Sequence, residues 1–231
     1  MIFATPTLDH RVTLDFFRSS LETDWLLATH GVPHGYKQVG GDQFIAKARN
    51  RLVAEFLIEF PMATDLFFLD DDISWPAAKV LEFLNRPEDV VCGVYPKKTE
   101  TLEFPVELES QDGALIEHDG LYRAVGAPTG FMRIKRHVLE SLASYARMYE
   151  EENKDGTKGK RWAIFEAGVN YDAGAFWGED YVFCQKARAR GFGIWVDPNI
   201  AFTHRGQRNW SGTLAPTIQS WIDAHPPAAG R

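Results

Sequence analysis

The chain has 231 residues, of which 45% are hydrophobic, 13% aromatic and 25% charged. These values are ordinary for a globular protein, and the aromatic content excludes a disordered one. The formal net charge of −7 argues against a general nucleic-acid-binding protein, which would normally be basic, and the length suits one α/β domain with a sizeable core.

The first half of the chain alternates between apolar runs and helical patterns. The apolar runs predict strands at 1–5, 24–31, 64–70 and 89–96. Helical spacing predicts helices at 8–23, 44–60 and 76–86, with residues 32–42 as a loop. In the first helix Leu14, Phe17 and Leu21 have helical spacing, and Asp42 is placed to cap the second helix. Apolar strands separated by helices predict a mostly parallel sheet that is covered on both faces.

The second half has a different pattern. Residues 104–127 read as short antiparallel strands, with turn signals at 111–113 and 118–120. Further helices are expected at 133–149 and 178–191, the second ending at Gly191, with a charged loop at 150–161 between them. A strand is expected at 192–198 and a tail at the C-terminus.

The two cysteines, Cys92 and Cys184, have no CxxC partner, so we expect buried reduced thiols. The N-terminus lacks the pattern of a signal peptide, and no window approaches the ~20 apolar residues of a membrane span. These features predict a cytoplasmic protein with no membrane span.

Three aspartates, Asp70, Asp71 and Asp72, directly follow the apolar run FFL. They therefore lie at the carboxyl end of a predicted strand, where open α/β sheets bind ligands. Side chains alternate along an extended segment, so Asp70 and Asp72 can face one side while Asp71 points away. A D-x-D pair of this kind suits a hard divalent cation, and a polar turn with a helix cap explains the run equally well.

A second acidic cluster, Glu179 and Asp180, opens a predicted helix after Phe176 and Trp177. Acidic residues are common in a first helical turn because the helix dipole favours them. Alternatively, one carboxylate faces a cleft as a general base, with the aromatic neighbours raising its pKa.

Two further features are candidates for ligand contact. His204 follows a predicted strand and precedes a loop with Arg205 and Arg208. An imidazole beside carboxylates suits manganese, and arginines suit phosphate oxygens. Pro128 and Gly130 predict a tight turn whose backbone amides could contact a polar ligand.

Taken in order, these segments resemble the glycosyltransferases of the GT-A fold, in a form similar to family 2, over roughly residues 1–210. The matching segments are AKARNRLVAEFL, LFFLDDDISWP, VVCGVYP, GAPTGFMRIKR, FWGEDYVFCQKARARGFGIWVDP and the histidine of FTHRG. The resemblance implies an α/β fold with a single GT-A, Rossmann-like domain at 1–215 and a smaller antiparallel element. Residues 1–95 would be the nucleotide-binding half, 96–215 the acceptor half and 216–231 a C-terminal tail.

The resemblance also implies an activity. The chain would be a hexosyltransferase that uses Mn²⁺ or Mg²⁺ to move a sugar from a UDP- or GDP-sugar to an acceptor hydroxyl. The acceptor, a saccharide, a protein or a small molecule, is not indicated, and no nucleic-acid partner is expected.

Residue roles follow from the same resemblance, position by position. The metal would be held by Asp70, Asp72 and His204. Asp180 would be the catalytic base, with Glu179 as the less favoured choice. The donor would contact Thr5, Pro6, Thr7, Arg49, Asp70, Asp71, Thr129, Gly130, Arg205 and Arg208. The acceptor would lie beside Trp177 and Gly178.

One departure from the family and two other classes of function stay open. Many members end their second strand with an acid that binds the base, whereas this chain has LLATHGVPHG, so the base is not indicated. A nucleotidyltransferase shares a similar core, but the stretch after the first strand, ATPTLDHRV, lacks the Gly-rich loop of that class. A metal-dependent nuclease or phosphatase, and an inactive sugar-binding module, are the remaining alternatives.

Overall fold

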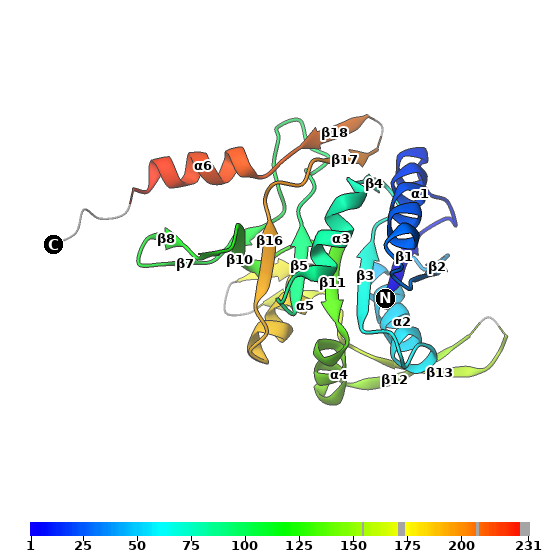
Figure 1. The fold of residues 1–231 in the computed structure, drawn as a ribbon. Helices are drawn as coiled ribbons and strands as arrows, with labels where there is room; N and C mark the ends of the chain where they lie inside the picture. Colours follow the sequence, from blue (N-terminus) through cyan, green and yellow to red (C-terminus); the bar gives the residue numbers. More distant parts are fainter. Residues whose placement is uncertain (154, 171–173, 207, 227–231) are drawn as a thin grey trace.

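The structure, a computed structural model, describes every residue except 154, 171–173, 207 and 227–231. It is a mixed α/β fold with one large central sheet and several small antiparallel sheets (Figure 1). The helices are α1 (Leu14–Thr29), α2 (Ile45–Glu59), α3 (Ala77–Asn85), α4 (Arg136–Tyr145), α5 (Glu179–Ala189) and α6 (Ala215–Ala224).

The central sheet has nine strands, most of which run in one direction. In spatial order the strands are β2 (Gly35–Gly40), β1 (Ile2–Thr7), β3 (Asp65–Leu69), β11 (Phe131–Lys135), β5 (Val90–Gly93), β16 (Ile194–Asp197), β10 (Leu121–Gly126) and β6 (Glu107–Leu108), with β9 (Glu117–His118) beside β10. Only β10 and β11 run opposite to the other strands of this sheet. The prediction of a mostly parallel sheet in an α/β fold is therefore confirmed.

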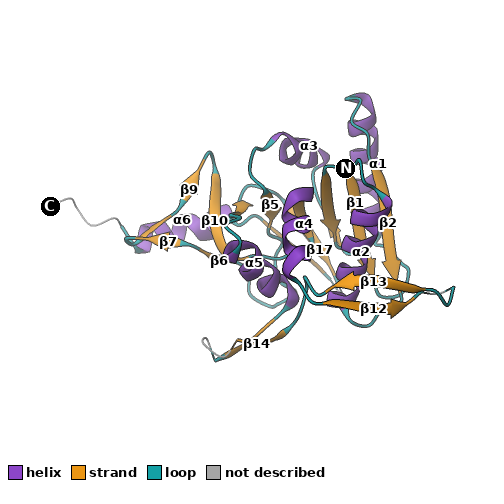
Figure 2. Cartoon of the chain, turned by 90° about the horizontal axis from the view of Figure 1, so that it is seen from below, coloured by secondary structure: helices purple, strands orange, loops and turns teal. Residues whose placement is uncertain are grey.

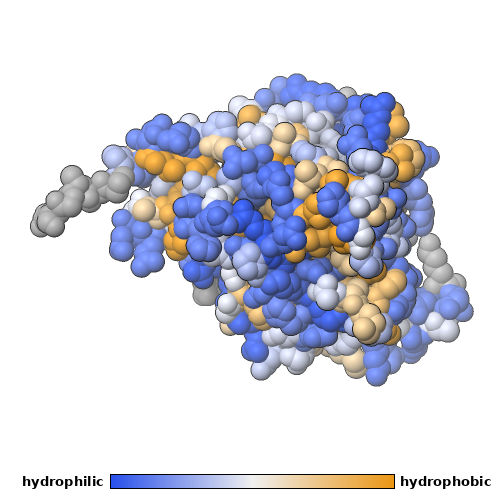
Figure 3. Space-filling view, viewed as in Figure 1, coloured by the Kyte–Doolittle hydropathy of each residue, from blue (hydrophilic) through white to orange (hydrophobic). Residues whose placement is uncertain are grey.

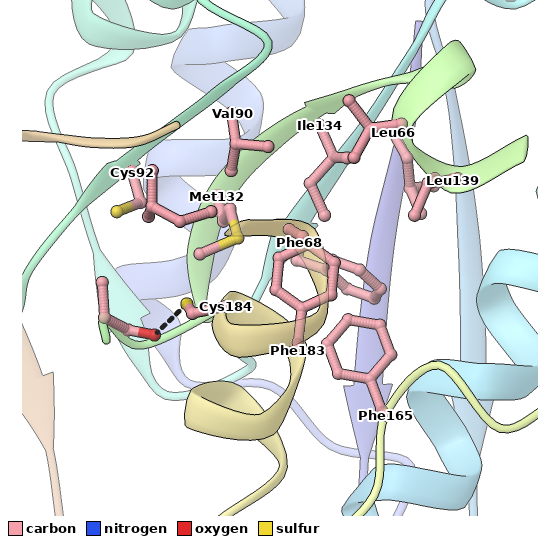
Figure 4. Packing of buried hydrophobic residues seen from close by; sticks show 14 of the residues in the cluster. Leu66, Phe68, Val90, Cys92, Met132, Ile134, Leu139, Phe165, Phe183 and Cys184 are labelled. Atoms are coloured by element: carbon pink, nitrogen blue, oxygen red, sulfur yellow. Dashed lines mark hydrogen bonds between the residues drawn. The ribbon is translucent and has the colours of Figure 1, made fainter. Parts of the chain in front are cut away.

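Helices cover both faces of the sheet, as expected from the continuously apolar strands. In β3, Leu66 and Phe68 point into one core cluster, whereas Phe67 and Leu69 point into the other. Figure 4 shows the first cluster, in which side chains of β3, β5 and β11 meet those of α4 and α5. The view in Figure 2 places α1 and α3 on the opposite side of the sheet from α2, α4 and α5.

The remaining strands form four small antiparallel sheets. They are β4 (Ile73–Ser74) with β17 (Phe202–Arg205) and β18 (Asn209–Gly212); β12 (Met148–Glu152) with β13 (Lys158–Trp162); β14 (Gly168–Asn170) with β15 (Ala175–Trp177); and β7 (Ser110–Gln111) with β8 (Ala114–Leu115). The predicted antiparallel element at 104–127 is confirmed. Both of its predicted turns have two central residues with positive φ, Asp112–Gly113 and Asp119–Gly120, as a two-residue hairpin requires.

The structure corrects the predictions for residues 8–42. Residues 24–29 continue α1 instead of forming a strand, and the edge strand β2 lies in the segment predicted as a loop. Leu14, Phe17 and Leu21, whose spacing indicated the helix, lie on the exposed face of α1. Asp42 accepts a hydrogen bond from the backbone N–H of Phe44, but it is not the N-cap of α2.

Three predictions in the second half are also wrong. The helix predicted at 133–149 is shorter, because β11 continues to Lys135 and β12 begins at Met148. The charged segment 150–161 lies mostly in the β12–β13 hairpin, where buried Arg161 pairs with Glu151 at 3.1 Å. Residues 216–224 of the predicted tail belong to α6, while 227–231 lie outside the described residues.

Two other expectations concern cysteines and membranes. Cys92 and Cys184 are both free and buried, as predicted. In the part of the chain that the structure describes, no helix combines the length and the apolar character needed to cross a membrane.

Candidate functional site

The predicted site residues gather at the carboxyl edge of the central sheet. The three aspartates follow β3, and the backbone N–H of Asp70 donates to the carbonyl of Gly130, which precedes β11, at 2.8 Å. After the aspartates, β4 pairs with β17, and His204 lies opposite Ile73 in the register. The N–H of Arg205 also donates to the carbonyl of Asp72 at 2.7 Å. Backbone pairing thus brings the histidine, far away in sequence, beside the aspartates.

Asp72 and His204 face each other with defined orientations. Nδ1 of His204 lies 2.8 Å from the carbonyl oxygen of Pro96, so this nitrogen carries the hydrogen and donates. Nε2 of His204 lies 3.4 Å from Oδ2 of Asp72, and the same carboxylate pairs with Lys98. Burial alone would raise the pKa of Asp72, but the interactions with His204 and Lys98 outweigh it and hold the pKa below its ordinary value.

Asp70 is held in place by two neighbours that bind its two carboxylate oxygens. Arg49 donates to Oδ1 at 3.0 Å and the hydroxyl of Tyr95 donates to Oδ2 at 2.8 Å. Gly130 packs directly on this arrangement, because a Cβ there would collide with the Asp70 carboxylate and the Tyr95 hydroxyl. Both carboxylate oxygens of Asp70 already have protein partners, so this residue is placed to hold the turn and the Arg49 side chain.

Asp180 lies at the start of α5 and combines burial with an opening to solvent. Its side chain is 26% exposed, and Oδ1 accepts a hydrogen bond from the hydroxyl of Thr129. Burial raises the pKa of Asp180 to about 7, Arg49 and Thr129 oppose this rise, and Glu179 adds to it. A carboxyl group with a pKa near neutrality is suited to general-base chemistry.

Arg49 connects these two groups of acids. Its side chain is only 2% exposed, and its Nε lies 3.5 Å from Glu179 Oε1 and 3.9 Å from Asp180 Oδ1. Nη2 of the same guanidinium donates to Oδ1 of Asp70 at 3.0 Å. The sequence predicted that Arg49 contacts a donor; in the structure it is a buried cation among three carboxylates.

Asp71 lies beside Thr7, the last residue of β1, and beside the start of α1. The backbone N–H of Thr13, the N-cap of α1, donates to the Asp71 carbonyl at 3.0 Å. Burial raises the pKa of the Asp71 carboxyl to about 6, and the hydroxyl of Thr7 opposes this shift. The aspartate run therefore joins the start of α1.

Five other residues that were predicted to contact the donor or the acceptor lie in β1 or directly before α5. Thr5, Pro6 and Thr7, which were expected to contact the donor, lie within β1, and all three are buried. Trp177 ends β15 and Gly178 is the N-cap of α5, which places both beside Asp180.

The two arginines after His204 are half exposed, and each pairs with an acid. Arg205 bonds to Asn209 at 2.9 Å and lies 3.9 Å from Asp15. Arg208 lies 3.1 Å from Glu100 and above the ring of Trp210. Both have the exposure that a phosphate contact would need.

The two potential metal ligands, Oδ2 of Asp72 and Nε2 of His204, fit a divalent cation. Nδ1 of His204 carries the hydrogen that the Pro96 carbonyl accepts, so whenever the imidazole is neutral its Nε2 has a lone pair on the side of the Asp72 carboxylate, where two acceptors would attract a cation. Their separation of 3.4 Å is close to the ~3 Å between neighbouring ligands of Mg²⁺ or Mn²⁺. Within the described residues no three His, Cys, Asp or Glu side chains form a metal-binding group, so the predicted three-residue set with Asp70 is not assembled.

Sequence reasoning missed two members of the site, Tyr95 and Lys98. Both follow β5, whose carboxyl end lies beside that of β3 across β11. Tyr95 fixes Asp70 and Lys98 neutralises Asp72. The signal available was their position after a predicted strand, in VVCGVYPKK, where polar residues reach the same edge of a parallel sheet.

The fold and the contacts above define an α/β protein with a cluster of acidic side chains at the carboxyl edge of its sheet. No family model and no curated protein matches the chain. Among solved structures, A197 from STIV is similar over 93% of this chain and 90% of its own length, with a TM-score of 0.56 and 19% identity. This likeness shows a shared fold.

A second solved structure is described as a glycosyltransferase involved in the glycosylation of the major capsid of PBCV-1. It matches 61% of this chain and 62% of its own length, with a TM-score of 0.36 and 13% identity. This match is too partial to carry an argument about either fold or function.

Proposed function

We propose that the chain is a metal-dependent GT-A glycosyltransferase, which moves a sugar from a nucleoside-diphosphate sugar to an acceptor hydroxyl. The observation that carries the proposal is the pair of Asp72 and His204, with Nδ1 of the imidazole fixed and Nε2 directed at the carboxylate. The resemblance in motif order, from the aspartates to this histidine, agrees with it. A donor with UDP or GDP fits equally well, and the acceptor is open.

Asp72 and His204 would hold Mn²⁺ or Mg²⁺, which binds proteins through few side chains when substrate phosphates supply further ligands. When bound, the ion would neutralise the charge that develops on the leaving diphosphate. Lys98, now paired with Asp72, is long enough to leave this carboxylate and contact a phosphate oxygen instead. Arg205 and Arg208 are exposed on the same side and would add positive charge near the diphosphate.

Asp180 would accept the proton of the acceptor hydroxyl. Its pKa of about 7 makes it a stronger base than an ordinary carboxylate, and Thr129 holds it in one orientation. Glu179 contacts the buried Arg49 and is less exposed, so it would support Asp180 in this role. A positioned general base typically contributes about 10²–10⁴ in rate.

The proposal is tested with a panel of nucleotide-sugars. The wild-type protein with Mn²⁺ should bind one donor by calorimetry and slowly release the nucleoside diphosphate as the sugar is transferred to water. Asp72→Asn should weaken metal-dependent donor binding at least about tenfold, because one charged ligand is lost. Asp180→Asn should keep donor binding and lose turnover.

The same panel distinguishes the other classes of function. Donor affinity that is unchanged by both EDTA and Asp72→Asn would refute the metal assignment. Binding without turnover for every donor would favour a sugar-binding module, and pyrophosphate release from nucleoside triphosphates with sugar phosphates would favour a nucleotidyltransferase.

A further inference from the structure

Helix α1 carries an apolar surface that nothing in the described chain covers. Leu14, Phe17, Leu21 and Trp25 are between 50% and 68% exposed. Their spacing of three and four residues puts them on one face of the helix. The buried face is the opposite one, with Phe16, Ser19, Thr23 and Leu27. In the view of Figure 3, apolar side chains are visible at the upper right of the molecule, where α1 lies in Figure 1.

The size of this surface is that of an interaction site. The four side chains leave on the order of 500 Å² open to water, comparable to the largest apolar patch of about 300–600 Å² on a typical monomer. Leu8 and Val12, in the segment before α1, are also exposed and extend it. A stable interface buries about 800 Å² per partner, so the apolar surface would supply more than half of it and a rim of polar residues the rest.

The charges on α1 argue against a membrane as the partner. The helix contains three acidic residues, Asp15, Glu22 and Asp24, and a single basic one, Arg18. Helices that lie on anionic lipid surfaces are rich in lysine and arginine. A surface with this charge balance is better suited to a protein.

The apolar surface matches an inverted copy of itself. In an antiparallel pair of α1 helices, Leu14 would face Trp25 of the second copy, and Phe17 would face Leu21. Arg18 and Glu22 lie together on one flank of the apolar face, and both are exposed. Equivalent flanks meet in an antiparallel pair, so Arg18 of each copy would face Glu22 of the other.

These two charged residues have no competing partner. Within the described residues, neither Arg18 nor Glu22 takes part in an ion pair, whereas Asp24 is paired with His34 and Asp15 lies near Arg205. An isologous interface requires such self-complementary charges.

We infer that α1 is the interface of a two-fold symmetric homodimer in which two α1 helices pack antiparallel. This inference does not depend on the proposed enzymatic function. It has a consequence for the site, because Thr13 at the start of α1 binds the carbonyl of Asp71. In each subunit, α1 would thus connect the dimer interface to the aspartate turn of the same subunit.

The first test measures the oligomeric state by sedimentation over a wide range of protein concentration. The wild-type protein should be a dimer at micromolar concentration, and Leu21→Glu should raise the dissociation constant by about 30-fold or more. Ile58→Glu is the matched control, because Ile58 is similarly exposed on α2, and it should leave the dimer unchanged. Thermal unfolding of the Leu21→Glu monomer verifies that it folds.

The second test addresses the antiparallel arrangement. Arg18→Glu and Glu22→Arg should each weaken the dimer, because each creates like charges across the interface. A mixture of the two variants should form heterodimers at the concentrations at which the wild-type protein dimerises. In the heterodimer, residue 18 of each copy again faces an opposite charge at residue 22 of the other.

Three outcomes would overturn the inference. They are a wild-type protein that stays monomeric at the highest concentration, a dimer that is insensitive to Leu21→Glu, and charge variants that do not rescue each other. If the monomeric protein floats with anionic vesicles, the partner of this surface is a membrane and not a second copy.

Discussion

At the level of single residues, Arg49 offsets the negative charge of the acids in the candidate site. Three carboxylates, those of Asp70, Glu179 and Asp180, surround one buried guanidinium. Burial would lower the pKa of Arg49, but these acids outweigh it and raise the pKa, so the side chain stays charged. Without this cation, the acids would repel one another in a poorly solvated place.

Replacing Arg49 with methionine should therefore destabilise the fold. We expect the free energy of unfolding to fall by about 3 kcal/mol at pH 8, because a buried charge network loses its only cation. The loss should be smaller at pH 5, since Asp180, with a pKa of about 7, is then protonated and repulsion is relieved. Chemical denaturation at both pH values measures this, with Arg147→Met as the control, because Arg147 is exposed and takes part in no ion pair among the described residues. An equal loss at both pH values would contradict the electrostatic explanation.

Asp180 gives a prediction about pH dependence. A base must be deprotonated, so kcat/KM for donor turnover should rise with pH through about 7 and then level off. Thr129 donates to the carboxylate and favours its charged form. Thr129→Val should thus shift the rise to higher pH by about one unit, with Thr129→Ser as the control that keeps the hydroxyl. An unchanged profile in Thr129→Val would remove Asp180 from the role of base.

At the level of elements, α1 shows why helical periodicity alone does not identify which face of a helix is buried. The exposed apolar residues have helical spacing, but the buried face combines Phe16 and Leu27 with two hydroxyl side chains, those of Ser19 and Thr23. Ser19 accepts from the backbone N–H of Trp75, and Thr23 accepts from its indole N–H at 3.0 Å. Side-chain hydrogen bonds, which a pattern of apolar residues does not reveal, thus join α1 to the segment between β4 and α3 in addition to the apolar contacts.

Thr23→Val tests this mode of packing. The substitution keeps the shape of the side chain but leaves the buried indole N–H of Trp75 without an acceptor. The free energy of unfolding should fall by about 1–3 kcal/mol, and Thr23→Ser, which retains the hydroxyl, should lose less. Denaturant unfolding monitored by tryptophan fluorescence measures both variants. A neutral Thr23→Val would show that apolar contact alone holds the helix.

The elements that the sequence predicts well are those with a single strong signal. The strands β3 and β5 are continuously apolar, and α2 has a regular apolar face, so their positions follow from pattern alone. The strand β2 is different, because GYKQVG is exposed on alternate residues at the sheet edge and contains two glycines. Only its pairing with β1 makes it a strand.

At the level of the whole molecule, long-range pairing assembles the site. The sequence places the aspartates, the acids of α5 and His204 at the ends of elements, and the structure brings them to one edge of the sheet. The contacts of Lys98 with Asp72 and of Tyr95 with Asp70 were not predictable, since they depend on how the segment after β5 folds back. The predicted metal ligands also included Asp70, but in the structure its two carboxylate oxygens accept hydrogen bonds from Arg49 and Tyr95.

The packing of the last helix, α6, shows whether the residues after 215 belong to the domain. Figure 1 shows α6 at the far end of the molecule, beyond β10, yet Leu214 and Ile218 join the same core cluster as β3 and β11. Along one side of α6, a cavity of about 390 Å³ is lined by Phe104, Leu108 and Trp221 among others. The helix therefore covers apolar residues that a frayed tail would leave exposed.

Ile218→Ala measures this contribution. Ile218 is 4% exposed, so the substitution should lower the free energy of unfolding by about 2–4 kcal/mol, through lost burial and a larger cavity. Unfolding should remain a single transition when far-UV dichroism and fluorescence are compared, because α6 shares one core with the sheet. Gln219→Ala, on the exposed side of α6, is the control and should change stability little. A loss confined to helical signal, at an unchanged midpoint for the rest of the protein, would instead make α6 an independent appendage and place the end of the domain at residue 215.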